Sequence, residues 1–334
     1  RGRCLRRQKM LMQKLRNTLL VFLLVALSTP LVAEPIAFSV NSDGVAPDED
    51  ILYEIDLGAG TYTPIGSIAN LPWSDVDVSD VEGMALDAAG TLYAFDDIST
   101  TLFTLDKQTA IPANDQFLSE LWISGGRNDV GMTFACDGTL YMTSVAQNKL
   151  YRVSPSGDME EVGTLGAGIN ISGIAAYGNP ARLYGLGNGN ADSPKLYEIH
   201  TGTGLATPVG TLGVLAEPYN EGGLDFDASG QLWAMTDRRI PNSLGSQVLK
   251  IDISRNSDMV VEANTLEKIG FESLAIAPPA GCAPVIQPPP GEPPAVEPPA
   301  DESQYKGVPS LSPMGLAFMA LLLLLTGLLS SRRF

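Results

Sequence analysis

The central part of the chain repeats itself. A Gly-led apolar segment begins at Gly83, Gly131, Gly173 and Gly223, which gives a period of 42 to 50 residues. Each of these segments is followed by a tight turn and by two further β-prone runs. Because a small sheet must bury its hydrophobic sides against its neighbours, a period of this length predicts a chain of similar β-sheets packed side by side.

Each repeat contains the signals of four antiparallel strands. The second strand begins with Leu and an aromatic residue, and it occurs at 92–95, 140–143, 183–186 and 232–235. The third strand occurs at 52–56, 102–106, 150–154, 196–200 and 248–252. A fourth segment contains Pro64 in one repeat and Pro208 in another, and proline fits an edge strand because it cannot donate a backbone hydrogen bond. Four strands per repeat of this size are typical of a β-propeller blade.

The two ends of the repeat region complement each other. The first repeat begins at its second strand, 36–40, and a matching first strand occurs at 272–276. We therefore predict an all-β fold, a five-bladed β-propeller at 34–278, in which the C-terminal strand closes the first blade and Ile276 lies beside Phe38. A six-bladed ring with one degenerate blade is the alternative, because 112–128 and 213–221 are poorly patterned. An open two-sheet sandwich gives no reason for a repeat.

The N-terminal segment has the pattern of an export signal. A basic stretch, 1–16, is followed by an apolar run at 18–27 and by small residues that end at Ala33. This pattern predicts a signal peptide at 1–33, recognised by the secretion machinery and cleaved after Ala33. The alternative is an uncleaved N-terminal anchor.

The C-terminal segment has the pattern of a stalk and a membrane anchor. Residues 279–307 are rich in proline, which favours an extended polyproline II linker. The following segment, 308–334, contains an apolar run that ends at Arg332 and Arg333. Such a run predicts a transmembrane helix with its C-terminus inside the cell.

This last segment resembles the IPTL-type C-terminal sorting domain of Gram-negative bacteria. The residues that match or conservatively replace its Ile-Pro-Thr-Leu-x-x-Trp-Gly motif are Val308, Pro309, Ser310, Leu311 and Gly315, and Met314 stands where Trp is usual. The resemblance implies recognition by a membrane sorting or processing enzyme, and a plain tail anchor is the alternative. The head resembles secreted bacterial β-propeller repeat proteins. Together these features predict an exported protein of the cell envelope or cell surface, anchored to the membrane at its C-terminus.

The charge of the head excludes one class of partner. All 38 Asp and Glu lie between Glu34 and Glu302, where only 11 of the 21 Lys and Arg are found. Such an acidic head repels nucleic acid. Two cysteines, Cys136 and Cys282, remain after removal of the signal peptide. An oxidising compartment allows them to pair, but the repeat places them near blades that are not neighbours, which argues against a disulfide.

The sequence lacks the residue types of several common catalytic sites. Its single histidine, His200, stands in the turn position that Asp56, Asp106 and Asp252 occupy in other repeats. We interpret His200 as a turn residue, so a Ser-His-Asp triad and a multi-His zinc site are not expected. The tryptophans are expected to pack between blades rather than to form a sugar platform, and they are Trp73, Trp122 and Trp233.

Acidic residues recur beside the predicted innermost strands. Glu82 and Glu272 precede that strand in equivalent positions, Glu221 is one residue away from this register, and Asp129 lies close to the same rim. We expect these four carboxylates to converge on the central channel and to bind a hard cation, with Ca²⁺ as the candidate cofactor. Further polar residues are predicted on the same face: Asp75, Asp77, Asp80, Asp96, Asp97, Asn188, Asn190, Asp192 and Asp237. The alternative is that all of these are ordinary solvated loop residues.

Three functions fit these observations. A binding or display module without enzymatic activity, which presents its loop face to an unknown ligand, is preferred because the blades lack the usual catalytic residues. A Ca²⁺-dependent hydrolase of the lactonase or esterase kind rests on analogy with other propellers. A structural spacer of the cell envelope is the third.

Overall fold

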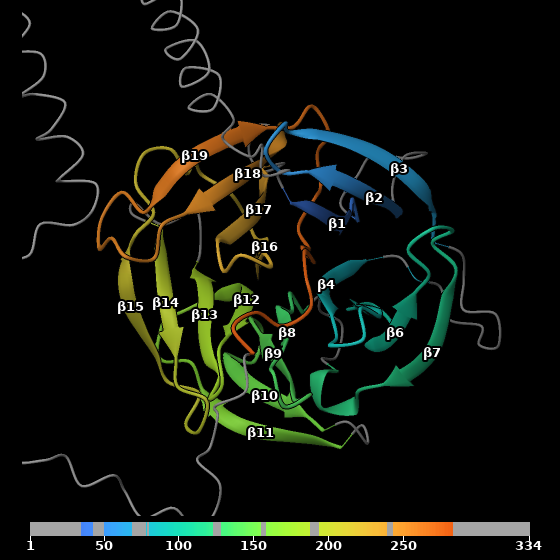
Figure 1. Ribbon diagram of the computed structural model, residues 1–334. Coiled ribbons are helices and arrows are strands. Elements are labelled where there is room, and N and C mark those ends of the chain that lie inside the picture. Colours follow the sequence, from blue (N-terminus) through green and yellow to red (C-terminus); the bar gives the residue numbers. More distant parts are fainter. Residues whose placement is uncertain are drawn as a thin grey trace, which may run out of the picture. The chain divides into compact units, whose positions relative to one another are not determined.

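The computed structural model describes residues 35–42, 50–68, 78, 80–122, 128–154, 158–187, 194–238 and 243–282. These residues form five small antiparallel sheets, arranged as blades around one axis (Figure 1). The predicted five-bladed β-propeller is therefore confirmed, and the six-bladed ring and the sandwich are wrong. The part of the chain that the structure describes contains no helix long and apolar enough to cross a membrane.

The strands follow one another from the inner to the outer edge of each blade. Blade 1 contains β1 (Ile36–Val40), β2 (Ile51–Asp56) and β3 (Thr61–Ser67). Blade 2 contains β4 (Val81–Leu86), β5 (Leu92–Asp96), β6 (Thr101–Leu105) and β7 (Pro112–Phe117). Blade 3 contains β8 (Met132–Phe134), β9 (Leu140–Ser144), β10 (Lys149–Val153) and β11 (Met159–Thr164). Blade 4 contains β12 (Ile171–Tyr177), β13 (Arg182–Gly187), β14 (Lys195–Ile199) and β15 (Ala206–Thr211). Blade 5 contains β16 (Gly222–Phe226), β17 (Leu232–Arg238), β18 (Leu244–Ile251) and β19 (Val260–Thr265).

The outer strands explain the segments whose pattern is weak. Strand β7 lies within the poorly patterned stretch 112–128, and its residues are mostly half-buried or exposed. Pro64 in β3 and Pro208 in β15 face Tyr53 and Tyr197 on the inner neighbours, at irregular positions of the ladders. An outer strand has one solvent-facing edge, so it needs neither a full set of donors nor a continuous hydrophobic face.

The ring closes through the C-terminal segment, as predicted, with the partner one residue earlier. Ala275, rather than Ile276, lies opposite Phe38. The Phe38 amide donates to the Ala275 carbonyl at 2.7 Å, and the Ala275 amide donates to the Phe38 carbonyl at 3.0 Å. Ser273 adds two bonds, because its carbonyl accepts from Ser39 Oγ at 2.5 Å and its Oγ accepts from the Val40 amide at 3.2 Å.

The Gly-led segments of the repeat are the innermost strands, and the glycines allow them to approach each other closely. A Cβ at Gly83 would lie 2.7 Å from the carbonyl oxygen of Val130 on the next blade. A Cβ at Gly131 would lie 2.6 Å from the carbonyl oxygen of Ser172. Side chains are thus excluded from this level of the hub, and the recurrence of glycine follows from the small radius of a five-bladed ring.

The expected packing of the tryptophans is confirmed for one of them. Trp233 is 1% exposed, its Nε1 donates to Asp227 Oδ2 at 3.0 Å, and the ammonium of Lys250 lies 4.9 Å from its ring centre. The expectation is wrong for Trp122, which follows a short 3₁₀ turn, η1 (Ser119–Leu121), and is 55% exposed. Trp73 lies outside the described residues.

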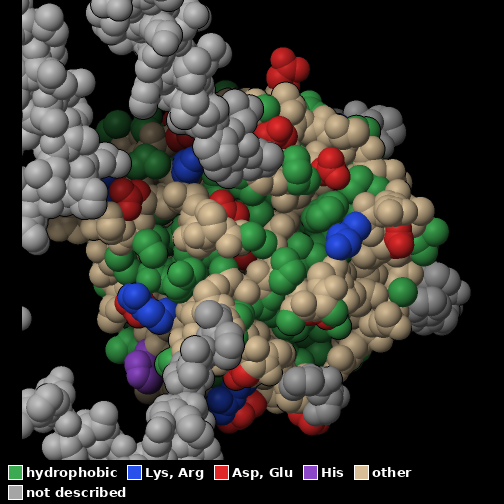
Figure 2. Space-filling model, in the orientation of Figure 1, with side chains coloured by type: hydrophobic (Ala, Val, Ile, Leu, Met, Phe, Trp, Pro, Cys, Tyr) green, Lys and Arg blue, Asp and Glu red, His purple; other side chains and the backbone are tan. Residues whose placement is uncertain are grey.

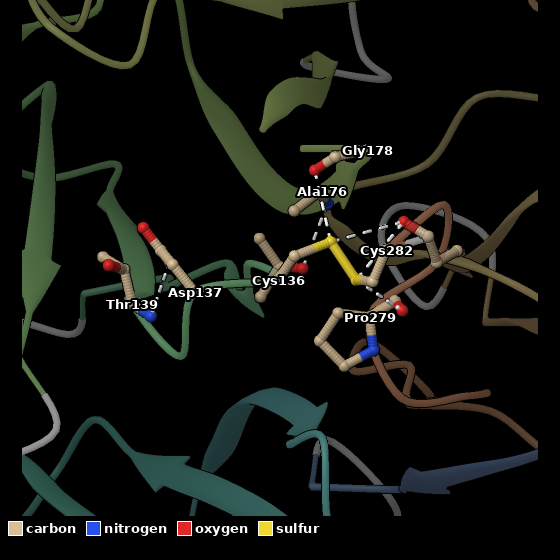
Figure 3. Close-up of a disulfide and its surroundings, with 9 residues drawn as sticks. Cys136, Asp137, Thr139, Ala176, Gly178, Pro279 and Cys282 are labelled. Carbon is tan, nitrogen blue, oxygen red and sulfur yellow. Dashed lines mark hydrogen bonds between the residues drawn. A yellow bond between two sulfur atoms is a disulfide. The ribbon is translucent and has the colours of Figure 1, made fainter. Parts of the chain in front are cut away.

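Cys136 and Cys282 form a disulfide, contrary to the sequence argument (Figure 3). Cys136 lies in the β8–β9 hairpin of blade 3, whereas Cys282 follows the strand that completes blade 1. After Ile276 the chain runs past blade 5, where Asp225 accepts from the Ile276 amide, and past blade 4, where the Gly178 amide donates to Ala280. It thus reaches blade 3, which is not a neighbour of blade 1, and Figure 1 shows this orange trace passing over the middle part of the ring. We name residues 277–282 the strap. Cys136 and Cys282 therefore meet although their blades are not neighbours, because the strap brings Cys282 from blade 1 to blade 3.

Several predictions concern residues outside the described part of the chain. They are the signal peptide at 1–33 with cleavage after Ala33, the linker beyond Cys282, and the sorting signal at 308–334. They remain predictions.

Candidate metal centre

Six carboxylates meet at one end of the hub. The structure brings together the four predicted acids, Glu82, Asp129, Glu221 and Glu272, and adds Asp80 and Asp237. The six acids form three groups in which carboxylate oxygens lie within 4.8 Å of one another: Asp80 with Glu82 and Glu272; Glu82 with Asp129 and Glu221; Glu221 with Asp237 and Glu272. Each glutamate belongs to two groups, so the three groups make one connected cluster, which we name the hub cluster.

The propeller fold places these side chains. Glu82 in β4 and Glu272 in the segment that completes blade 1 stand directly before Gly83 and Ser273, in the equivalent positions that the repeat predicted. Blade 4 has Ser172 at this position, and its hydroxyl bonds to the backbone of Gly222, donating to the carbonyl at 3.3 Å and accepting from the amide at 3.0 Å. Among the described residues, blade 4 therefore contributes no acid to the hub cluster.

The acids of the hub cluster differ in burial. Glu272 is 1% exposed and Glu82 is 7% exposed, whereas Asp129 and Glu221 are half-buried. Neither carboxylate oxygen of Glu272 accepts a hydrogen bond from a described residue. A buried carboxylate without donors is strongly unfavourable unless it holds a proton or lies beside a cation.

The electrostatics of the hub cluster favour protonation in the absence of a cation. Burial, followed by the negative charges of neighbouring acids, raises the pKa of Glu82 and of Glu272 well above the ordinary value. Burial, followed by the negative charge of Asp129, raises the pKa of Glu221 to about 9. A divalent cation would replace these protons and stabilise the ionised carboxylates.

The carboxylate of Asp237 is held in place by one backbone donor and one side-chain donor. Asp237 Oδ1 accepts from the Gly270 amide at 3.3 Å, and Asp237 Oδ2 accepts from Asn220 Nδ2 at 3.2 Å. The Asp237 amide donates to the Glu221 carbonyl at 2.9 Å, which fixes these two acids side by side. The sequence placed Asp80 and Asp237 on this face but did not show that they join the four predicted acids, because their positions depend on the turns around β4 and β17.

Two other acids of this face have structural roles. Asp96 Oδ2 accepts from the Asp80 amide at 2.9 Å, and Asp97 Oδ2 accepts from the Asn128 amide at 2.7 Å. The second bond joins blade 2 to blade 3 beside Asp129. The remaining polar residues predicted here lie outside the described residues: Asp75, Asp77, Asn188, Asn190 and Asp192.

The channel below the hub cluster is too narrow for a substrate. A cavity of about 10 Å³ lies between the five inner strands and is lined by Glu82, Gly131, Gly173 and Leu274 among others. This volume holds about one water molecule. A cation or a water can therefore occupy this cavity, and a larger ligand cannot.

His200 is a turn residue, as predicted. Its Nδ1 accepts from the Gly202 amide at 3.1 Å, and its carbonyl accepts from the Gly204 amide at 2.8 Å. Asp56 has the same role in blade 1, where its carboxylate accepts from the Ala59 amide at 2.8 Å. Neither residue belongs to the hub cluster.

Comparison with known proteins gives structural likenesses only. The sequence matches no protein-family model and no curated protein sequence. A catalytically inactive variant of virginiamycin B lyase from Staphylococcus aureus with quinupristin is similar over 66% of this chain and 64% of the lyase, with 17% identity and a TM-score of 0.39. A putative gluconolactonase is similar over 74% of this chain and 83% of its own, with 14% identity and a TM-score of 0.42. A luciferin-regenerating enzyme is similar over 72% and 83%, with 15% identity and a TM-score of 0.41. No activity is carried over to this chain from these proteins.

Proposed function

We propose that this protein is a Ca²⁺-binding propeller of the cell envelope that presents its carboxylate face to a ligand and has no enzymatic activity. The observation that carries the proposal is Glu272, a carboxylate that is 1% exposed, accepts no hydrogen bond from a described residue and belongs to a cluster of six acids. A bound cation stabilises such an arrangement with its carboxylates ionised at neutral pH.

The donor set favours calcium over other divalent ions. All six side chains of the hub cluster offer oxygen, which excludes the nitrogen and sulfur ligands typical of zinc. Ca²⁺ accepts six to eight oxygen ligands in flexible geometry, whereas Mg²⁺ demands an octahedron and retains several waters. A crowded group of carboxylates from four different blades suits the first ion better.

The proposed location rests on the two ends of the sequence. The predicted export signal at 1–33, the proline-rich stretch after Cys282 and the sorting segment at 308–334 support an exported head that is tethered to the membrane. The acidic composition supports a ligand other than nucleic acid, and on the face seen in Figure 2 the Lys and Arg side chains lie singly rather than in a patch.

Titration calorimetry with Ca²⁺ tests the proposal. The expected result is binding by the wild-type chain and at least a tenfold weaker affinity for the double variant E82Q/E272Q. The matched control is E198Q, because Glu198 is a β14 residue whose carboxylate pairs with Arg182 far from the hub cluster. Identical titrations of the wild-type chain and of E82Q/E272Q would falsify the site.

A second candidate function is hydrolysis of an ester or lactone. Asp129 and Glu221 are half-buried rather than fully buried, so a cation bound at the hub cluster can retain a water molecule beside them. This function predicts Ca²⁺-dependent turnover of simple lactones or aryl esters that E221Q loses. No turnover by a chain that binds Ca²⁺ supports the binding module instead.

A further inference from the structure

The segment that closes the ring also carries part of the hub cluster. Glu272 stands near the start of this segment and Cys282 at its end, with the Ala275 pairing between them. We name residues 270–282 the closing segment. Its ladder with blade 1 consists of the Phe38–Ala275 bridge alone, whereas the other four blades have four-stranded ladders. The closing segment therefore depends on other contacts to stay in place.

The carboxylate end of the closing segment is held by the groups around Glu272. The Gly270 amide donates to Asp237 Oδ1 at 3.3 Å, and the Phe271 amide donates to Ser246 Oγ at 3.0 Å. The ring of Phe271 is buried against the ring of Tyr53, and the two ring centres lie 5.2 Å apart. Glu272 opposes these contacts, because its buried charge repels the other acids of the hub cluster until a proton or a cation neutralises it.

The far end of the closing segment, which includes the strap, is held by contacts with blades 5, 4 and 3. The Ile276 amide donates to Asp225 Oδ2 at 2.7 Å, which ties the closing segment to blade 5. The Gly178 amide of blade 4 donates to the Ala280 carbonyl at 2.9 Å. Two residues later, the disulfide joins Cys282 to blade 3. Cys282 is exposed, so a soluble thiol can reach its sulfur.

We propose that the closing segment has two clamps, a cation at Glu272 and the Cys136–Cys282 disulfide, and that the ring opens readily only when both are released. This inference rests on the cation site proposed above. Because both clamps act on one segment, each changes the effect of the other, as linkage requires. In the oxidised chain the strap already limits the movement of Glu272, so a bound cation stabilises the closed ring by a smaller amount.

Release of the disulfide requires a dithiol reductant. Its thiolate attacks Cys282 Sγ and displaces Cys136 Sγ as a thiolate, which takes up a proton. The second thiol of the reductant then displaces Cys282 Sγ. Two electrons and two protons pass to the protein, which gains two thiols, and the reductant becomes a cyclic disulfide.

Amide hydrogen exchange of the full chain tests the two clamps. The probes are the Ala275 and Phe38 amides, whose bonds to each other report ring closure. The chain is measured oxidised and reduced with dithiothreitol, each with Ca²⁺ or with a chelator. Reduction without Ca²⁺ is expected to accelerate exchange at both probes. Ca²⁺ at a hundred times its dissociation constant is then expected to slow exchange by about 100-fold in the reduced chain and by clearly less in the oxidised chain.

Matched controls separate this inference from the cation site itself. The variant C136S/C282S is expected to behave as the reduced chain and to ignore dithiothreitol, and the Leu196 amide in the centre of blade 4 is expected to respond to neither clamp. An oxidised chain that binds no Ca²⁺ overturns the proposed function. A chain that binds Ca²⁺ but shows the same exchange at Ala275 before and after reduction overturns the two clamps and leaves the cation site intact.

Discussion

At the scale of single residues, glycine and glutamate have different roles at the hub. Gly131 and its equivalents let the inner strands approach each other, and the residue before that position points a carboxylate toward the same axis in blades 1 and 2. Close backbone packing and charge crowding are therefore products of the same small radius. Both can be tested by single substitutions.

The substitution G131A is expected to destabilise the head. The new Cβ would lie 2.6 Å from the Ser172 carbonyl, and backbone atoms cannot move away without disturbing blade 4. Overpacking of this kind costs about 1 to 3 kcal/mol. Urea unfolding measures the loss. The control is G202A, because the nearest atoms to a Cβ at Gly202 belong to the flexible side chain of His200. Equal stability of G131A and G202A would contradict the close approach.

The protonation of Glu221 predicts how pH affects stability. Its pKa is raised from 4.5 to about 9 in the folded chain, so between these values the folded state holds more protons than the unfolded state. Without a cation, the stabilisation from Glu221 is complete below pH 4.5 and is lost as the pH rises through about 9. Bound Ca²⁺ favours the ionised form, so the increase in Tm that Ca²⁺ causes should grow over the same range. Thermal unfolding with Ca²⁺ or with chelator checks this, and a gain independent of pH counts against it.

At the scale of elements, the blades differ in how they are completed. Blades 2 to 5 are hairpins continuous in sequence, whereas blade 1 receives its inner strand from the closing segment. Asp225 in β16 compensates in part, because its carboxylate accepts a hydrogen bond from the Ile276 amide across the junction. The junction between blades 5 and 1 is thus the element boundary where side-chain bonds replace a regular ladder.

The variant D225A is expected to weaken this junction, whereas D225N is expected to keep most of it. Alanine leaves the Ile276 amide without its acceptor, which costs about 1 to 3 kcal/mol for a buried group, while the carbonyl oxygen of asparagine can still accept the bond. Chemical denaturation of the two variants measures the difference. The interpretation fails if D225N loses as much stability as D225A.

At the scale of the whole molecule, the disulfide links the end of the strap to blade 3. The bond joins residues 146 positions apart, with Cα atoms separated by 5.3 Å. A cross-link over so long a stretch strongly restricts the unfolded chain. It also fixes the strap against the inner hairpins of blades 3 and 4, at the ends of the inner strands away from the hub cluster.

Loss of the disulfide is expected to lower the stability of the entire head. The chain-entropy model gives a loss of about 4 to 5 kcal/mol for a closed loop of this length. Thermal unfolding of C136S/C282S in the presence of excess Ca²⁺ measures it while the cation clamp stays in place. A Tm within error of the oxidised wild-type chain would show that the strap is held by its other contacts.

The sequence by itself determined the blades, because each repeat must bury its own hydrophobic strands. The periodic glycines and Leu–aromatic pairs mark those strands within each repeat. It also determined that Glu82 and Glu272 face the axis, since equivalent positions in a repeat take equivalent places around a ring. Only the tertiary structure decided that Asp80 and Asp237 join them, that Trp122 is exposed, and that Cys136 bonds Cys282. These three outcomes depend on turns and on a strap that runs from blade 1 to blade 3, where contacts form between residues that no period relates.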